Sequence, residues 1–156
     1  MKLQILAVSN KMPTWVSAAC EEYLKRFKRE YTVKLKEIKP EKRKASYTTE
    51  QILAREEESI RQSIEPGSYL VVLDEKGVGL NTLGWVDLLR RWQAQSESPC
   101  FVIGSSDGVS PLLKKESALT LQLSQLTLPH GLARIILLEQ LYRAISIIQN
   151  HPYHRG

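Results

Sequence analysis

The stretch 69-YLVVLDEKGVGLNTLGWVDLLRRWQAQSESPCFVIG-104 decides the fold. Its two ends, residues 69–74 and 100–104, are apolar except for Asp74, as strands buried on both faces of a parallel sheet are. Between them, a helix is expected to begin at Asn81 or Thr82. Strand, helix and strand in this order form the repeating unit of α/β proteins, so the stretch predicts a parallel sheet.

The same alternation continues on both sides of this unit. Toward the N-terminus, the patterns predict strands at residues 2–9 and 32–38 and helices at residues 13–27 and 48–63. Toward the C-terminus, they predict a short helix capped by Ser110, an alternating stretch at 119–128 and a long helix at 132–150. We therefore expect one domain over residues 1–156, of the α/β class, with a mostly parallel sheet and helices on both faces.

The composition is that of a globular protein. Hydrophobic residues make up 42% and charged residues 25% of the chain, which argues against disorder. Cys20 and Cys100 are too few for a disulfide framework and are not spaced as metal ligands. No apolar run is long enough to span a bilayer, and no cleavage site follows the first apolar stretch. These features predict a cytoplasmic protein with no membrane partner.

The positive charge is concentrated in the first third of the chain. Residues 1–44 hold 12 Lys and Arg against 5 Asp and Glu, whereas the remainder holds 10 against 12. One interpretation is a solvated helix face followed by a charged loop. The other is a surface that faces a polyanion such as RNA, with Lys42, Arg43 and Lys44 as its candidate contacts. Charge alone does not decide between them.

Three loops rich in Gly or Pro follow predicted strands: LDEKGVG (73–79), GSSDG (104–108) and LTLPHG (126–131). None matches a known phosphate-binding loop, and each could simply form a tight turn. Parallel sheets nevertheless bind their ligands beyond the carboxyl ends of the strands. Three such loops at one edge of the sheet therefore favour a pocket.

The last predicted helix and the segment after it are unusual. From residue 133 to residue 148, apolar side chains occupy almost every face of the helix, so it is either the central helix of a monomer or buried against a partner subunit. The chain then ends in NHPYHRG (150–156). The histidines His130, His151 and His154 could bind a metal, the end could be disordered, or it could be catalytic.

Four motifs occur together: VIGSSDGVSP (102–111), LTLPH (126–130), LLEQLYRA (137–144) and NHPYHR (150–155). Together they resemble the SPOUT class of methyltransferases, and more closely its small RlmH-type enzymes. These methylate N3 of a pseudouridine in helix 69 of large-subunit (23S) ribosomal RNA. The resemblance runs nearly end to end. One departure is that the family usually reads Gly-Gly-Pro-x-Gly where this chain has Gly-Ser-Ser-Asp-Gly at residues 104–108.

The resemblance implies a trefoil knot at the C-terminus, bound S-adenosyl-L-methionine with no metal, and a homodimer across the last helices. Ribosomal RNA, or the assembled ribosome, is the implied substrate. By position, the implied cofactor-binding residues are Leu73, Gly104, Leu123, Ser124, Gln125, Leu126, Thr127 and Leu128. Without the resemblance, residues 123–128 would be interpreted as an ordinary half-buried strand.

The resemblance also suggests roles for the C-terminal residues in removing the imide proton of a uracil-type base. Arg155 could hold the resulting anion or a neighbouring phosphate of the RNA, and His154 could act as base or donor. Tyr153 could stack on the target base. His130, beside the cofactor loop, is a second candidate base, and the sequence does not decide between the two histidines.

Two other functions are open on the sequence. A non-enzymatic RNA- or ribosome-binding protein on the same fold would account for the basic first third of the chain. A small-molecule α/β enzyme acting on anions would account for the glycine loops. The first does not explain the residues of the C-terminal segment, and the second leaves the basic first third of the chain without a role.

Overall fold

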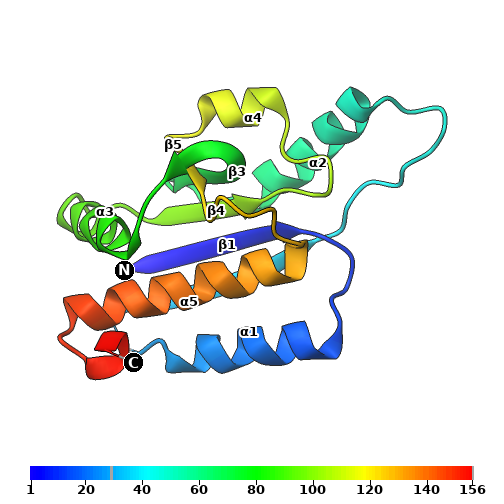
Figure 1. Ribbon diagram of the computed structural model, residues 1–156. Coiled ribbons are helices and arrows are strands. Elements are labelled where there is room, and N and C mark those ends of the chain that lie inside the picture. Colours follow the sequence, from blue (N-terminus) through cyan, green and yellow to red (C-terminus); the bar gives the residue numbers. More distant parts are fainter. Residues whose placement is uncertain (29, 156) are drawn as a thin grey trace.

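Residues 1–28 and 30–155 are described by the computed structural model, and within them five strands form one sheet (Figure 1). The order across the sheet is β2-β1-β4-β3-β5, and every neighbouring pair is parallel. The strands are β1 (Lys2–Val8), β2 (Thr32–Ile38), β3 (Tyr69–Gly79), β4 (Pro99–Ile103) and β5 (Leu119–Gln122). The predicted α/β class and parallel sheet are confirmed.

The helices are α1 (Thr14–Arg26), α2 (Thr49–Ser63), α3 (Thr82–Ala94), α4 (Pro111–Glu116), α5 (His130–Ile148) and the 3₁₀ turn η1 (Pro152–Arg155). Helices α2, α3 and α4 begin at side-chain caps that the sequence carries. Thr48 forms a capping box with Gln51, and Ser110 Oγ accepts the amide of Leu113 at 3.1 Å. The side chain of Asn81 caps α3 in the same way.

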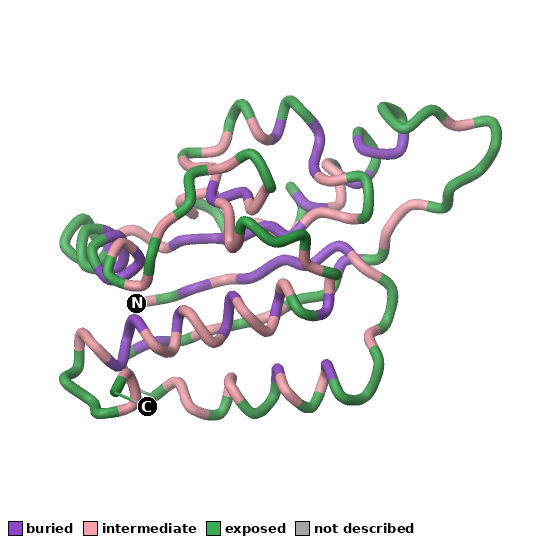
Figure 2. Tube along the Cα trace, in the orientation of Figure 1, coloured by how far each residue is buried: buried purple, intermediate pink, exposed green. Residues whose placement is uncertain are grey.

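Helices cover both faces of the sheet, as expected. Helices α1, α3 and α5 pack on one face around Ile5, Phe101 and Leu137, whereas α2 and α4 pack on the other around Leu6 and Val102. Figure 2 shows the buried segments concentrated on the central strands and along α5. None of the described helices is long and apolar enough to cross a membrane.

The predicted lengths of β3 and β5 were wrong. Beyond Leu73, β3 shifts its register and continues to Gly79, where we had expected a loop. The shift is possible because residue 77 is glycine: a Cβ there would lie 2.5 Å from the carbonyl carbon of Leu121. Conversely, β5 ends at Gln122, paired with Gly79 at the end of β3, so the alternating residues after it have no strand to pair with.

Helix α5 lies on the sheet between α1 and α3. Gly131 lets α5 approach α1 closely, because a Cβ at this position would lie 2.9 Å from Val16 Cγ2. Arg134 is 2% exposed and donates to Glu37 Oε1 at 2.8 Å and to Ser9 Oγ at 2.5 Å. Packing within one chain therefore buries much of this apolar helix. Because the helix does not need a partner subunit for this burial, the predicted dimer stays a prediction.

Candidate active site

A large cavity lies at the carboxyl edge of the sheet, where ligands of parallel sheets bind. Its volume is about 1140 Å³, enough for a small-molecule ligand and part of a second one. Its walls come from the segments that follow β1, β2, β4 and β5, from residues 73–76 within β3, from Lys114 on α4 and from the first turn of α5. All three glycine- or proline-rich loops singled out in the sequence contribute to it.

Seven of the eight residues expected to bind the cofactor line this cavity. They are Leu73, Gly104, Leu123, Ser124, Leu126, Thr127 and Leu128. Gln125 is exposed and does not belong to the lining. Residues 123–128 belong to no helix or strand, so their backbone amides and carbonyls are not committed to a sheet. Such a stretch can offer backbone groups to the polar edge of a ligand and apolar side chains to its faces.

The turn at residues 104–108 forms although the second glycine and the proline of the usual motif are absent. The amide of Gly108 donates to the carbonyl of Ser105 at 2.8 Å, and Gly108 adopts a φ of 86°, which favours glycine. Gly104 passes so close to this returning chain that a Cβ would lie 2.5 Å from the carbonyl carbon of Gly108. Glycine at 104 is thus required by the turn itself.

His130 is the one histidine among the described residues that lines the cavity. Its ring nitrogens are buried near the backbone of Gly104 and Val8, and neither makes a hydrogen bond within the described part of the chain. Burial, and then the charge of Arg134, lower the pKa of His130 below its usual 6.5. The imidazole is therefore neutral at pH 7 and able to accept a proton.

The lowered pKa of His130 predicts how stability depends on pH. Since the unfolded chain binds this proton more readily, the free energy of unfolding should fall as the pH drops below about 6.5. Replacing His130 with Gln should weaken this loss. Urea unfolding at pH 7.5 and 5.5 measures the difference. An identical loss in wild type and His130→Gln would contradict the prediction.

The C-terminal segment lies at the opposite end of α5. Tyr153 packs against Tyr142, with 4.6 Å between ring centroids, and donates to Glu139 Oε2 at 2.5 Å. Burial and the Glu139 carboxylate raise the pKa of Tyr153, so the phenol stays protonated. His154 Nδ1 lies 2.7 Å from the carbonyl of His151, and Arg155 is exposed.

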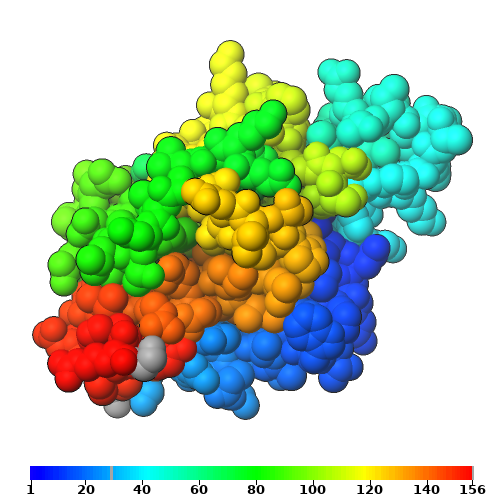
Figure 3. Space-filling view, viewed as in Figure 1, coloured from blue at the N-terminus to red at the C-terminus, as the bar shows by residue number. Residues whose placement is uncertain are grey.

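This segment is remote from the cavity of its own chain. Helix α5 separates them by 19 residues, or about 28 Å at 1.5 Å per residue. Figures 1 and 3 show the segment, in red, at the end of the molecule away from the loop that contains Lys42, in cyan. Within one chain the structure therefore brings His130 to the predicted cofactor residues, but not Tyr153, His154 or Arg155.

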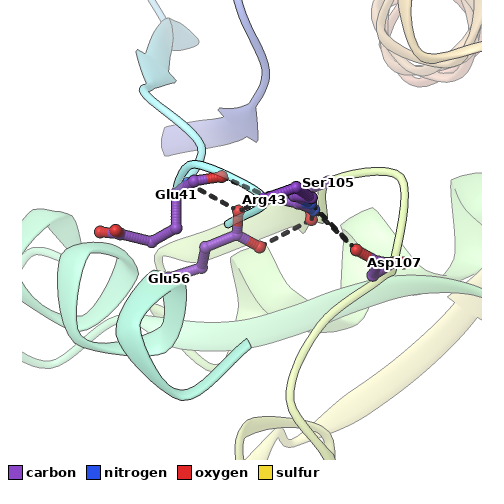
Figure 4. A network of polar contacts seen from close by, with 5 residues as sticks. All are labelled: Glu41, Arg43, Glu56, Ser105 and Asp107. Atoms are coloured by element: carbon purple, nitrogen blue, oxygen red, sulfur yellow. Dashed lines mark hydrogen bonds and ion pairs between the residues drawn. The ribbon is translucent and has the colours of Figure 1, made fainter. Parts of the chain in front are cut away.

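The basic residues expected to bind RNA follow β2 at the mouth of the cavity. Lys42 and Arg43 are among the lining residues, and Lys42 and Lys44 are exposed. Arg43 differs from its neighbours, because its guanidinium is engaged with carboxylates of Glu56 and Asp107 (Figure 4). Glu56 was not predicted from the sequence, because it is one of several acidic residues on an amphipathic helix. In the structure it is buried, with 2% of its surface exposed.

No group of three or more His, Cys, Asp or Glu side chains that could hold a metal ion occurs in the described ranges 1–28 and 30–155. In particular, His130 lies at the first residue of α5, whereas His151 and His154 follow its last.

The all-parallel sheet and the cavity at its carboxyl edge place the chain among the α/β proteins that bind a ligand beyond the ends of their strands. Comparison with known proteins shows to which family of this class the chain belongs. Residues 1–154 match the family model described as "Predicted SPOUT methyltransferase", so the chain belongs to the SPOUT methyltransferase family. Membership of this family implies a knotted C-terminal region, which general rules of chain topology would not suggest. The resemblance inferred from the motifs is confirmed.

Individual relatives are similar over almost their whole length. The chain is 50% identical to "Ribosomal RNA large subunit methyltransferase H" of Neisseria meningitidis serogroup C, over 155 residues and 99% of each protein. Proteins of the same name from Dechloromonas aromatica and Chromobacterium violaceum are 50% and 49% identical over the same share of each chain.

Proposed function

We propose that this protein transfers a methyl group from S-adenosyl-L-methionine to large-subunit ribosomal RNA, at N3 of a pseudouridine in helix 69. The observation that carries the proposal is the cavity, whose wall contains seven residues that the family resemblance implies bind the cofactor. The chain matches 99% of the length of its relatives, and their names, which contain "Ribosomal RNA large subunit methyltransferase", agree with this class of substrate. Such a substrate would place the protein in the cytoplasm.

The lining residues fit the proposed cofactor. Leu73, Leu123 and Leu128 offer apolar surfaces on which an adenine ring could lie, and the uncommitted backbone of residues 123–128 offers donors and acceptors. S-adenosyl-L-methionine would supply an already activated methyl group, so the protein must position the target nitrogen and remove its proton. His130, neutral and part of the cavity wall, would accept that proton once one of its buried ring nitrogens is exposed to the substrate.

The remaining catalytic groups must reach the cavity from a second copy of the chain. We infer a homodimer in which two α5 helices run antiparallel, because a two-fold axis then brings the end of one helix to the start of the other. Apolar side chains suited to an interface are exposed near the start of α5: Leu132 is 38% and Trp15 on α1 is 59% exposed. Tyr153, His154 and Arg155 of one subunit would then complete the site of its partner.

In this arrangement the three residues divide the task. Arg155 would neutralise the imidate anion of the target base or hold a neighbouring phosphate. Tyr153 would stack on the base, or donate to it in place of its hydrogen bond to Glu139. His154 would serve as donor or base beside His130. The two histidines are distinguished by substitution, since loss of the residue that takes the proton should alter the pH profile of turnover.

Two measurements test the proposed function. The first is the melting temperature with and without S-adenosylhomocysteine, because a ligand of the folded state raises it. The second is methylation of large-subunit RNA and of assembled ribosomes, read by mass spectrometry of the modified nucleoside. Cofactor binding and a methylated pseudouridine are expected. No melting shift at saturating cofactor would instead favour the non-enzymatic RNA-binding protein.

The exposed lysines at the mouth of the cavity predict the salt dependence of RNA binding. Replacing Lys42 and Lys44 with Ala should weaken RNA affinity and reduce the slope of log affinity against log salt by about 1.5, because each phosphate contact releases counterions. Cofactor affinity should not change. Lys34 and Lys36, exposed on β2 and outside the cavity lining, make a matched control of equal charge. An unaltered slope in the Lys42/Lys44 variant would show that these lysines are only solvated.

A further inference from the structure

Arg43 joins three segments of the chain that meet beside the cavity. Its Nη1 donates to the carbonyl of Glu41 at 2.7 Å and to Glu56 Oε2, on α2, at 2.9 Å. Its Nε and Nη2 lie 3.1 and 2.8 Å from Asp107 Oδ2, and Nη2 donates to Ser105 Oγ at 3.0 Å. Figure 4 shows the guanidinium between the loop after β2, helix α2 and the turn after β4.

The anchor of this network is Glu56, a buried carboxylate. Besides Arg43, it accepts the amide of Glu41 at 3.0 Å and the hydroxyl of Ser105 at 2.6 Å. A buried charge is tolerated when it is paired and its remaining oxygens are hydrogen-bonded, and both conditions hold here. Asp107, by contrast, is about one-third exposed, so its pair with Arg43 does more to place the turn than to stabilise the fold.

The contacts made by Ser105 and Asp107 act on the turn that Gly104 opens. Ser105 stands where the family motif usually has its second glycine, and Ser106 stands where it has proline. Both polar side chains that this turn contributes to the network, Ser105 and Asp107, are held by Arg43. A side-chain clamp thus fixes a turn that lacks the proline.

We propose that Arg43 is a positioning residue of the cofactor site, holding the turn at residues 104–108 against the basic loop at the cavity mouth through Glu56, Ser105 and Asp107. The proposal rests on the proposed function, because the turn is a wall of the proposed cofactor cavity. It assigns Arg43 a role different from that of Lys42 and Lys44, which have no part in the network. RNA bound at the basic loop would therefore be coupled to the shape of the cofactor turn.

The conservative variant Arg43→Lys tests the proposal. It keeps the charge beside Glu56, but a single ammonium cannot reach all four acceptors that the three guanidinium nitrogens contact. Affinity for S-adenosylhomocysteine, measured by calorimetry, should fall about tenfold, and the KM for the cofactor should rise with kcat little changed. Asp107→Asn should show a smaller loss, and the double variant should lose less than the two single losses combined, since both remove one interaction.

Arg61→Lys is the matched control. Arg61 also pairs with two carboxylates, Glu57 and Glu116, and is similarly exposed, but it does not line the cavity. Its substitution should leave cofactor affinity unchanged. Unchanged affinity in Arg43→Lys, an equal loss in Arg61→Lys, or losses that simply add for Arg43 and Asp107 would each overturn the proposal.

A second readout keeps the test independent of the proposed function. Hydrogen exchange of the peptide containing the Gly108 amide, which donates to Ser105, should become faster in Arg43→Lys without any cofactor present. If the wild type fails to bind cofactor while this exchange still accelerates, the function is wrong and the clamp stands. Unchanged exchange would overturn the clamp whatever the cofactor result.

Discussion

Deleting residues 151–156 should reduce methyl transfer to the level of the uncatalysed background while leaving cofactor binding intact. The segment contributes Tyr153, His154 and Arg155 to the proposed chemistry, yet it lies about 28 Å along α5 from the cavity of its own chain. The deletion removes the contact of Tyr153 with Tyr142 and its hydrogen bond to Glu139, so stability should fall by about 1–2 kcal/mol. Methylation of ribosomes and a cofactor titration of the same preparation measure both effects.

Single substitutions should separate the roles within the segment. Arg155→Ala should weaken RNA engagement, and His154→Ala should slow turnover and change its pH profile where chemistry limits the rate. Neither should alter cofactor affinity. A truncated protein that methylates RNA at the wild-type rate would contradict a catalytic role for the whole segment.

Gly104→Val should abolish cofactor binding. A Cβ at this position meets the backbone of Gly108 and lies 2.8 Å from Val109 Cγ2, so the turn must move away from β4. Cofactor affinity should fall more than a hundredfold, and overpacking should cost about 1–3 kcal/mol of stability. Stability falls as well as affinity because the clash is with the protein itself. Calorimetric titration and urea unfolding of the same sample measure the two losses.

Gly67→Ala is the control for this loss of stability. Gly67 has a φ of 78°, so alanine there is strained, but the position is remote from the cavity lining and has open space around it. It should destabilise the protein and leave cofactor affinity unchanged. Wild-type affinity in Gly104→Val would exclude the turn from the cofactor site.

Local signals made most of the fold predictable. The apolar strands at 69–74 and 100–104 specified the parallel sheet, and Thr48 and Ser110 marked helix starts within one residue. The ends of the strands were less predictable, because they depend on the neighbouring strand. Strand β5 ends at Gln122, opposite the last residue of β3, although the alternating pattern of β5 continues to residue 128. The extension of β3 depends on the close approach of Gly77 to Leu121, a tertiary contact with no local signal.

The cofactor residues could be predicted only through the family resemblance, because residues 123–128 by themselves look like an ordinary half-buried strand. The network around Arg43 could not, since Glu56, Ser105 and Asp107 come from segments about 50 residues apart and look like ordinary polar surface. Local sequence also could not place Tyr153, because the length and direction of α5 determine where the chain ends.

The most direct test of the account is complementation between two inactive chains. One lacks residues 151–156, and the other carries Gly104→Val. Each should form inactive homodimers. In a random mixture, about half of the dimers contain one chain of each kind. Each such dimer has one intact site, made of the cavity of the truncated chain and the C-terminal segment of the Gly104→Val chain. Methylation of ribosomal RNA should therefore recover to about one quarter of the wild-type rate. No recovery in mixed dimers that are shown to form would contradict an active site shared between subunits.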